Sequence, residues 1–244
     1  MFDLSIVIPC YNEEKNLQNL VSQIKEIKQN NQNINLEFIL VNDGSTDQTS
    51  AKLFELNNDN IYSIVDLKKN HGYEGSIQEG LKISKGEIVS WTHSDLQCDI
   101  NDILIVYNLY KSKLLNGDCI VKGKRIHRKL VDSFFSNSMA ILASILFNKK
   151  FREINAQPKV FSKNLLKEFY NAPKDFSLDL YLLYISKLKS YEIIEHPVVY
   201  KKRLAGVSKG GDSFFGKIKL TLRTLKYIIN LRINSHDSHN SQNK

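Results

Sequence analysis

The fold is decided first by residues 36–47, whose sequence is LEFILVNDGSTD. Residues 36–41 form an apolar run that is typical of a β-strand. Residues 42–47 are turn residues that end in a helix N-cap, and a helix is expected over residues 49–56. This stretch therefore predicts one strand–loop–helix unit.

The same order of elements recurs on both sides of this unit. Strands are expected at residues 4–8, 61–67 and 87–92, and helices at residues 17–27 and 76–84. Strands that alternate with helices predict an α/β fold, with a mixed, mostly parallel sheet covered by helices on both faces. Ligands of such folds gather beyond the carboxyl ends of the strands.

The second half of the chain is less regular. Helices are expected at about residues 101–115 and 178–188, and strands at residues 119–122, 158–161 and 191–200. We expect one main domain over residues 1–213, a basic amphipathic helix over residues 214–233 and a disordered polar tail over residues 234–244. The apolar stripe of that basic helix fits docking on a membrane surface, on the domain or on a second subunit.

Composition narrows the class of partner. The chain has 244 residues, a net charge of +8 and a pI of about 9.2, which favours nucleotides, phospholipid surfaces or nucleic acid as partners. No nucleic-acid recognition motif accompanies the charge, so no nucleic-acid partner is expected. The three cysteines form no metal-binding or redox pair, which fits a reducing cytoplasm. The sequence shows neither a signal peptide nor about 20 consecutive apolar residues, so we expect a cytoplasmic protein, either free or peripheral on the inner face of the membrane.

The most informative loop has the sequence WTHSDLQ at residues 91–97, after the last strand of the first half. If the chain stays extended there, His93, Asp95 and Gln97 project to the same side. A carboxylate in such a cluster can bind a divalent ion, whose charge neutralises a diphosphate leaving group. A second interpretation is that Ser94 and Asp95 only cap the following helix, and local signals leave both open.

Three motifs occur in order at successive predicted strand ends: IVIPCYNEE at residues 6–14, VNDGSTD at residues 41–47 and SDLQ at residues 94–97. Together they resemble the family-two glycosyltransferases, which have the GT-A (Rossmann-like) fold, and most closely the dolichyl-phosphate mannosyltransferase-like, polyprenyl-phosphate branch. The resemblance covers roughly residues 3–210. It implies inverting transfer of a sugar from a UDP- or GDP-sugar to a polyprenyl phosphate or a glycan intermediate of the cell envelope, assisted by Mn²⁺ or Mg²⁺.

The resemblance also implies roles for single residues of this sequence. The nucleotide-binding candidates are Pro9, Tyr11, Glu13 and Asp43; the catalytic candidates are Asp95 and Gln97; the metal-binding candidates are Asp95 and His93; and the candidates for acceptor or phosphate binding are Arg125, Arg203, Ser208 and Lys209. The first nucleotide-binding motif also fits an ordinary helix start, and the second fits an ordinary turn. A structural role and a role in nucleotide binding can hold together. The planar guanidinium of arginine can bind a phosphate through two hydrogen bonds, and the small residues nearby let the phosphate come close to the backbone.

Two positions depart from the family's pattern. His93 replaces the first aspartate of Asp-x-Asp, and three roles are open for it. It can be a nitrogen ligand, in which case the site should tolerate Mn²⁺ better than an all-oxygen site does. It can instead donate a hydrogen bond beside a site that binds metal weakly, or it can be a structural histidine. Asn155 lies where many relatives carry an aspartate, and an amide is no general base at neutral pH. This favours a polyprenyl phosphate, which is already anionic, although Asp179 remains a candidate base. The alternative function is an inactive nucleotide-sugar-binding or scaffold protein at a membrane.

Overall fold

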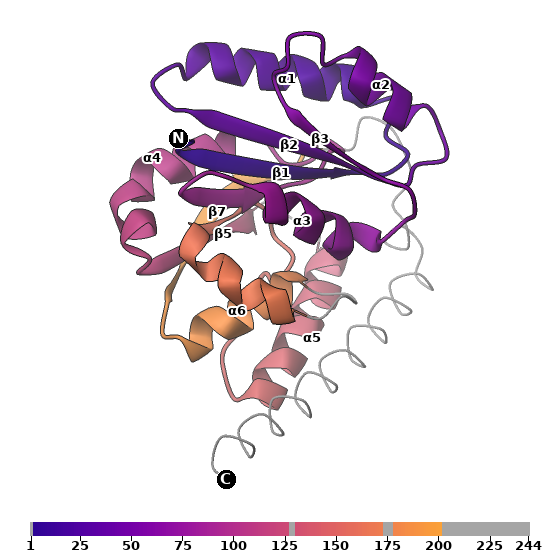
Figure 1. The fold of residues 1–244 in the computed structure, drawn as a ribbon. Helices are drawn as coiled ribbons and strands as arrows, with labels where there is room; N and C mark the ends of the chain where they lie inside the picture. The colour runs from indigo at the N-terminus through magenta and orange to yellow at the C-terminus, as the bar shows by residue number, and fades with distance from the viewer. Residues whose placement is uncertain (1, 127–129, 173–177, 202–244) are drawn as a thin grey trace.

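The computed structural model describes residues 2–126, 130–172 and 178–201 (Figure 1). Within this part of the chain the strands are β1 (Leu4–Cys10), β2 (Leu36–Asp43), β3 (Ser63–Leu67), β4 (Ile88–Trp91), β5 (Cys119–Ile126), β6 (Lys159–Ser162) and β7 (Glu192–Val199). The helices are α1 (Leu17–Asn30), α2 (Thr49–Glu55), α3 (Gly72–Ile83), α4 (Asn101–Asn116), α5 (Leu130–Phe147), the 3₁₀ helix η1 (Lys163–Asn171) and α6 (Leu178–Leu188). The helix and tail expected over residues 214–244 lie outside the described residues.

The strands form one sheet in the order β3-β2-β1-β4-β6-β5-β7. β1 pairs in parallel with both β2 and β4, while β6 runs antiparallel between β4 and β5. The prediction of a mixed, mostly parallel sheet is therefore confirmed. The chain leaves β1 toward β2 on one side and returns to β4 on the other, so the strand order reverses between β1 and β4, which is a topological switch point.

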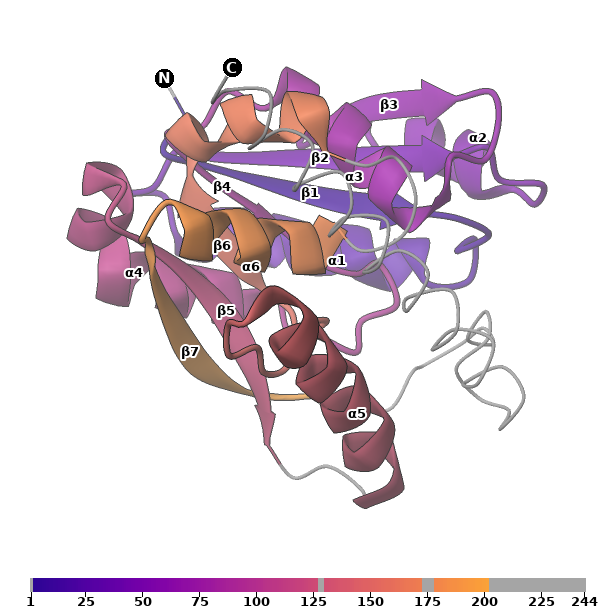
Figure 2. The same ribbon diagram turned by 90° about the horizontal axis from the view of Figure 1, so that it is seen from below.

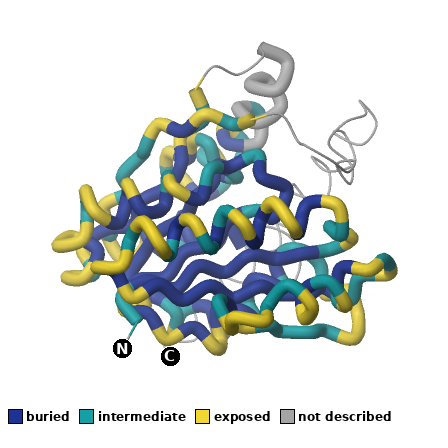
Figure 3. The backbone as a smooth tube through the Cα atoms, turned by 90° about the horizontal axis from the view of Figure 1, so that it is seen from above, coloured by how far each residue is buried: buried dark blue, intermediate teal, exposed yellow. Residues whose placement is uncertain are grey.

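Helices cover both faces of the sheet, as the sequence predicts. α1, α2 and α4 pack on one face and α3, α5 and α6 on the other. Alternate strand residues supply the two cores: Ile6 and Phe38 face the first layer, and Val7 and Ile39 face the second. Figure 2 views the face with α3 and α6, and Figure 3 shows α1 over the buried strands from the opposite side.

Helix α3 lies close to the sheet because of one glycine. A Cβ added at Gly80 would lie 2.4 Å from Cγ1 of Val7 and 3.0 Å from Cγ2 of Val41. The absent side chain therefore lets the helix backbone approach β1 and β2 directly. None of the described helices is long and apolar enough to cross a membrane.

Candidate functional site

The loops after β1 and β2 are joined by hydrogen bonds. The N–H of Asn12 donates to Oγ of Ser45 at 3.0 Å, and the N–H of Thr46 donates to Oδ1 of Asn12 at 2.8 Å. The N–H of Glu13 also donates to Oγ1 of Thr49 at 2.8 Å. Asn12 has a positive φ of 55°, a conformation that asparagine tolerates better than most residues. Two motifs that are about 30 residues apart in the sequence thus form one structural unit.

Three of the predicted nucleotide-binding residues lie on this unit. Pro9 is buried within β1, Tyr11 follows the strand and is half-buried, and Glu13 lies at the start of the next helical turn. Oε2 of Glu13 accepts a hydrogen bond from Nδ2 of Asn16 at 2.6 Å. The structure therefore brings these residues to the carboxyl end of β1, and their role in nucleotide binding stays a prediction.

Asp43, the fourth predicted nucleotide-binding residue, ends β2 and is buried. Its Oδ1 accepts the backbone N–H of His71 at 2.7 Å, and its carbonyl accepts Nδ2 of Asn70 at 3.1 Å. The next residue, Gly44, has a φ of +62°, and a Cβ there would meet the carbonyl carbon of Lys69 at 2.5 Å. Asp43 and Gly44 thus tie the β2 loop to the loop after β3, whatever else Asp43 binds.

The loop at residues 91–97 does not stay extended, so the condition under which His93, Asp95 and Gln97 were expected to project to the same side is not met. β4 ends at Trp91, and Leu96 has a positive φ of 60°. The backbone N–H of Gln97 donates to Oδ1 of Asp95 at 3.1 Å. The Asp95 carboxylate therefore closes a turn of its own loop, which bends the chain away from the strand direction.

The alternative that Ser94 and Asp95 cap the following helix is not seen at the start of α4, where the N-cap residue is Ile100 and the nearby carboxylate that binds a backbone N–H is that of Asp99. Oδ1 of Asp99 accepts the N–H of Asn101 at 3.0 Å, and its Oδ2 forms an ion pair with Lys201 at 2.8 Å. Burial opposes ionisation of Asp99, but the hydrogen bonds from Lys201 and Asn101 outweigh it and lower its pKa. The N–H of Lys201 also donates to the carbonyl of Gln97 at 2.8 Å. The chain after β7 is thereby fastened to the Asp95 loop.

His93 is half-buried, and its imidazole stacks on the ring of Tyr73 from the first turn of α3. The ring centroids are 5.0 Å apart and the planes differ by 26°. Asp95 is 5% exposed two residues further along the chain. Among the described residues, no three His, Cys, Asp or Glu side chains are grouped to hold a metal ion. The donor set fits a cation that one or two side chains hold and that diphosphate oxygens complete, as is common for Mg²⁺.

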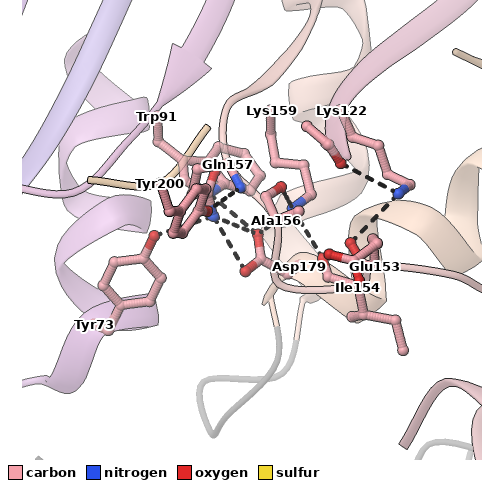
Figure 4. A network of polar contacts seen from close by, with 11 residues as sticks. Tyr73, Trp91, Lys122, Glu153, Ile154, Ala156, Gln157, Lys159, Asp179 and Tyr200 are labelled. Carbon is pink, nitrogen blue, oxygen red and sulfur yellow. Dashed lines mark hydrogen bonds and ion pairs between the residues drawn. The ribbon is translucent and has the colours of Figure 1, made fainter. Parts of the chain in front are cut away.

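A buried polar network lies beyond Trp91 (Figure 4). The carboxylate of Asp179 forms an ion pair with Lys159 at 3.1 Å and accepts hydrogen bonds from Nε2 of Gln157 at 3.1 Å and Nε1 of Trp91 at 3.3 Å. Burial lowers the pKa of Lys159 to about 8, although Asp179 pulls it upward. Nε2 of Gln157 also lies 3.3 Å from the hydroxyl of Tyr73.

The sequence does not reveal this network. Lys159 stands in a short predicted strand with no sign that its charge is buried, and Gln157 belongs to no motif. Asp179 was singled out only as a candidate base, and it lies at the start of α6. Burial of three polar side chains follows from how β6 and α6 pack, which local patterns do not encode.

The predicted phosphate-binding residues are only partly placed. Nε of Arg125 contacts Oε2 of Glu153 at 2.7 Å, and its guanidinium lies 5.5 Å from the ring centroid of Tyr200. Arg125 thus already has an acidic partner, and its role toward phosphate stays a prediction. Asn155 lies in the turn before β6. Arg203, Ser208 and Lys209 lie outside the described residues.

The sheet order and the polar loops at its switch point define an α/β protein that binds ligands beyond β1 and β4. The glucosyl-3-phosphoglycerate synthase of Mycobacterium tuberculosis, solved in complex with Mn²⁺, UDP-glucose and phosphoglyceric acid, matches the structure with a TM-score of 0.67. The identity is 16%, and the match covers 95% of this chain and 79% of that chain. The fold is therefore the GT-A fold.

The family follows from the sequence comparison. A profile described as "Glycosyl transferase family 2" matches residues 5–167, and the chain belongs to this family. It is 24% identical to a dolichyl-phosphate β-glucosyltransferase of Trichomonas vaginalis over 95% of this chain and 74% of that protein. It is 26% identical to a dolichol-phosphate mannosyltransferase of Pyrococcus furiosus over 92% of this chain and 64% of that protein. The predicted family and its polyprenyl-phosphate branch are confirmed, and the chain spans about two thirds to three quarters of these relatives.

Proposed function

We propose that this chain is an inverting glycosyltransferase that moves a sugar from a nucleoside-diphosphate sugar to a polyprenyl phosphate. The observation that carries the proposal is the position of Asp95, a buried carboxylate just beyond β4 at the switch point of the sheet. The two relatives are named as transferases of dolichyl phosphate and dolichol phosphate, which supports a polyprenyl phosphate as the acceptor. The Mn²⁺ and UDP-glucose of the solved synthase support the donor and the cation.

The loops around Asp95 have separate tasks in this proposal. Pro9, Tyr11 and Glu13 line the nucleoside pocket, and Asp43 contacts the base or the ribose. Asp95 and His93 would hold a Mn²⁺ or Mg²⁺ ion, whose charge would stabilise the departing diphosphate. The interlocked loops after β1 and β2 keep these groups in place before the donor binds, which lowers the cost of reaching the transition state.

The acceptor needs no strong base. A polyprenyl phosphate is already ionised at neutral pH, so its oxygen can attack the anomeric carbon directly, and an amide at Asn155 costs the reaction nothing. Lys159, Gln157 and Trp91 all contact the carboxylate of Asp179, so its oxygens are already occupied by partners within the protein. Arg125, together with Arg203, Ser208 and Lys209, contacts the acceptor phosphate in this proposal.

The activity is tested with a panel of UDP- and GDP-sugars in the presence of Mn²⁺. We expect slow hydrolysis of one donor by the wild type and a loss of at least about 100-fold in Asp95→Asn, because the amide binds the cation poorly. Asp102→Asn makes the same chemical change on α4 and should keep the activity. Equal inertness of the wild type and Asp95→Asn toward every donor would instead favour an inactive nucleotide-sugar-binding protein.

A further inference from the structure

His93 poses a problem of orientation that a carboxylate in its place would not have. An imidazole offers each lone pair in a single direction within the ring plane, so a histidine ligand works only when its ring is held. In this structure the Tyr73 ring lies over the imidazole, with 5.0 Å between the centroids and 26° between the planes. Near-parallel stacking of this kind restricts rotation of the His93 ring.

Tyr73 is itself held through its hydroxyl. Nε2 of Gln157 lies 3.3 Å from the Tyr73 oxygen and 3.1 and 3.2 Å from the two oxygens of Asp179. A carboxylate only accepts hydrogen bonds, so the nitrogen of the Gln157 amide has to face Asp179. The orientation of this amide is therefore fixed, and its N–H groups point to both Asp179 and Tyr73.

The far end of this chain of contacts is rigid and buried. Lys159 and Gln157 are 0% exposed and Asp179 is 7% exposed. Lys159 also donates to the carbonyls of Ile154 and Ala156, at 2.9 and 2.7 Å. A buried ion pair is expensive to desolvate, so this pair is weak evidence for stability, but it holds the Asp179 carboxylate beside Lys159.

We propose that Tyr73 is a positioning residue for His93, and that Gln157 and Asp179 keep Tyr73 in place. The contacts run from Lys159 through Asp179 and Gln157 to Tyr73 (Figure 4). The stacked rings of Tyr73 and His93 then join α3 to the loop after β4. The inference rests on the proposed cation site at His93 and Asp95. Asp179 is thereby assigned a positioning role in place of that of a base.

The test is a double-mutant cycle on Mn²⁺ affinity, measured by electron paramagnetic resonance of free Mn²⁺ with saturating UDP or GDP. Loss of a residue that orients a metal ligand costs about 10- to 100-fold in affinity. We expect about tenfold weaker Mn²⁺ binding in Tyr73→Leu. We expect a smaller loss in Tyr73→Phe, which keeps the stack and removes the hydroxyl that Gln157 contacts.

The second arm of the cycle uses His93→Asp, which restores two carboxylates. A carboxylate does not depend on ring stacking, so Tyr73→Leu should have no further effect on Mn²⁺ affinity in that background. An equal loss in both backgrounds would mean general damage to the fold and would overturn the inference while the proposed function stands. Absence of nucleotide-dependent Mn²⁺ binding in the wild type would overturn the proposed cation site as well.

A matched control and a metal-free readout complete the design. Tyr110→Leu removes a partly buried aromatic ring from α4 on the opposite face, and it should leave Mn²⁺ affinity unchanged. The imidazole resonances of His93, assigned through His93→Gln, should shift in Tyr73→Leu because the ring current of Tyr73 is lost. Resonances that coincide with those of the wild type would contradict the stacking on which the inference depends.

Discussion

Asp102 lies in the first turn of α4 and is half-buried. Burial and the nearby charge of Asp99 raise its pKa from 3.8 to about 6, while Lys201 acts in the opposite direction. Because the pKa is higher in the folded state, the folded chain binds the proton more tightly between these two values. The free energy of unfolding therefore falls as pH rises from 3.8 to about 6. Above about pH 6 it is lowered by the full cost of keeping the Asp102 carboxylate ionised in the folded state.

We expect Asp102→Asn to raise the free energy of unfolding at about pH 7.5, by on the order of 1 kcal/mol after solvent screening. The gain should shrink at about pH 4.5, where the folded wild type is mostly protonated. Urea denaturation at the two pH values measures both. Asp59→Asn, at an exposed ion pair with Lys25, should change little at either pH. A gain of the same size at both pH values would contradict the assignment to ionisation of Asp102.

Single residues differ in how far the sequence alone can place them. Asp43 and Asp95 are predictable because Asp43 is the last residue of β2 and Asp95 lies in the loop that follows β4, and the carboxyl ends of parallel strands share one edge of a sheet. The contact between Tyr73 and His93 is not predictable. It depends on where α3 packs, and α3 packs closely because Gly80 has no side chain to hold it away from β1 and β2.

Whole elements were easier to predict than their ends. β1, β2 and β4 lie where apolar runs predict strands, because these runs are buried on both faces of the sheet. The sequence predicts that this helix starts at residue 76, because Gly72 and Gly75 are typical turn residues. In the structure α3 already begins at Gly72. The antiparallel direction of β6 could not be predicted, because β6 has only four residues and its direction is set by pairing with β4 and β5.

Helix α5 presents an apolar face beside positive charge. Ile141 and Ile145 are 60% and 71% exposed, one turn apart. They line a cavity of about 900 Å³ together with basic side chains from Lys124, Lys149, Lys150 and Arg152. Figure 2 shows α5 extending away from the sheet beside β5. This combination favours contact with an anionic membrane surface, which is where a polyprenyl phosphate resides.

We expect the double variant Ile141→Ser/Ile145→Ser to bind vesicles that contain anionic phospholipid at least about tenfold more weakly, because a buried isoleucine contributes roughly 1.5–3 kcal/mol. Vesicle sedimentation measures this binding. Leu109→Ser removes a side chain that is 63% exposed on α4, and it should not change binding. Binding that is equal in all three proteins would rule out α5 as the membrane contact.

The molecule as a whole assembles its site from motifs that are far apart in the sequence. The sheet places β1 between β2 and β4, so the Asn12, Asp43 and Asp95 loops meet at one edge although they span more than 80 residues. Lys201 then fastens the chain after β7 to the Asp95 loop. The residues predicted to bind the acceptor, at 203–209, follow Lys201 in the sequence and lie outside the described residues.

The most direct measurement follows a radiolabelled sugar from the donor found in the hydrolysis panel. Polyprenyl phosphate in detergent and a soluble glycan are offered in parallel with Mn²⁺. We predict Mn²⁺-dependent transfer of label to the polyprenyl phosphate, with inversion at the anomeric carbon, and loss of transfer in Asp95→Asn but not in Asp102→Asn. Transfer only to the glycan, or transfer that survives Asp95→Asn, would contradict the proposed function.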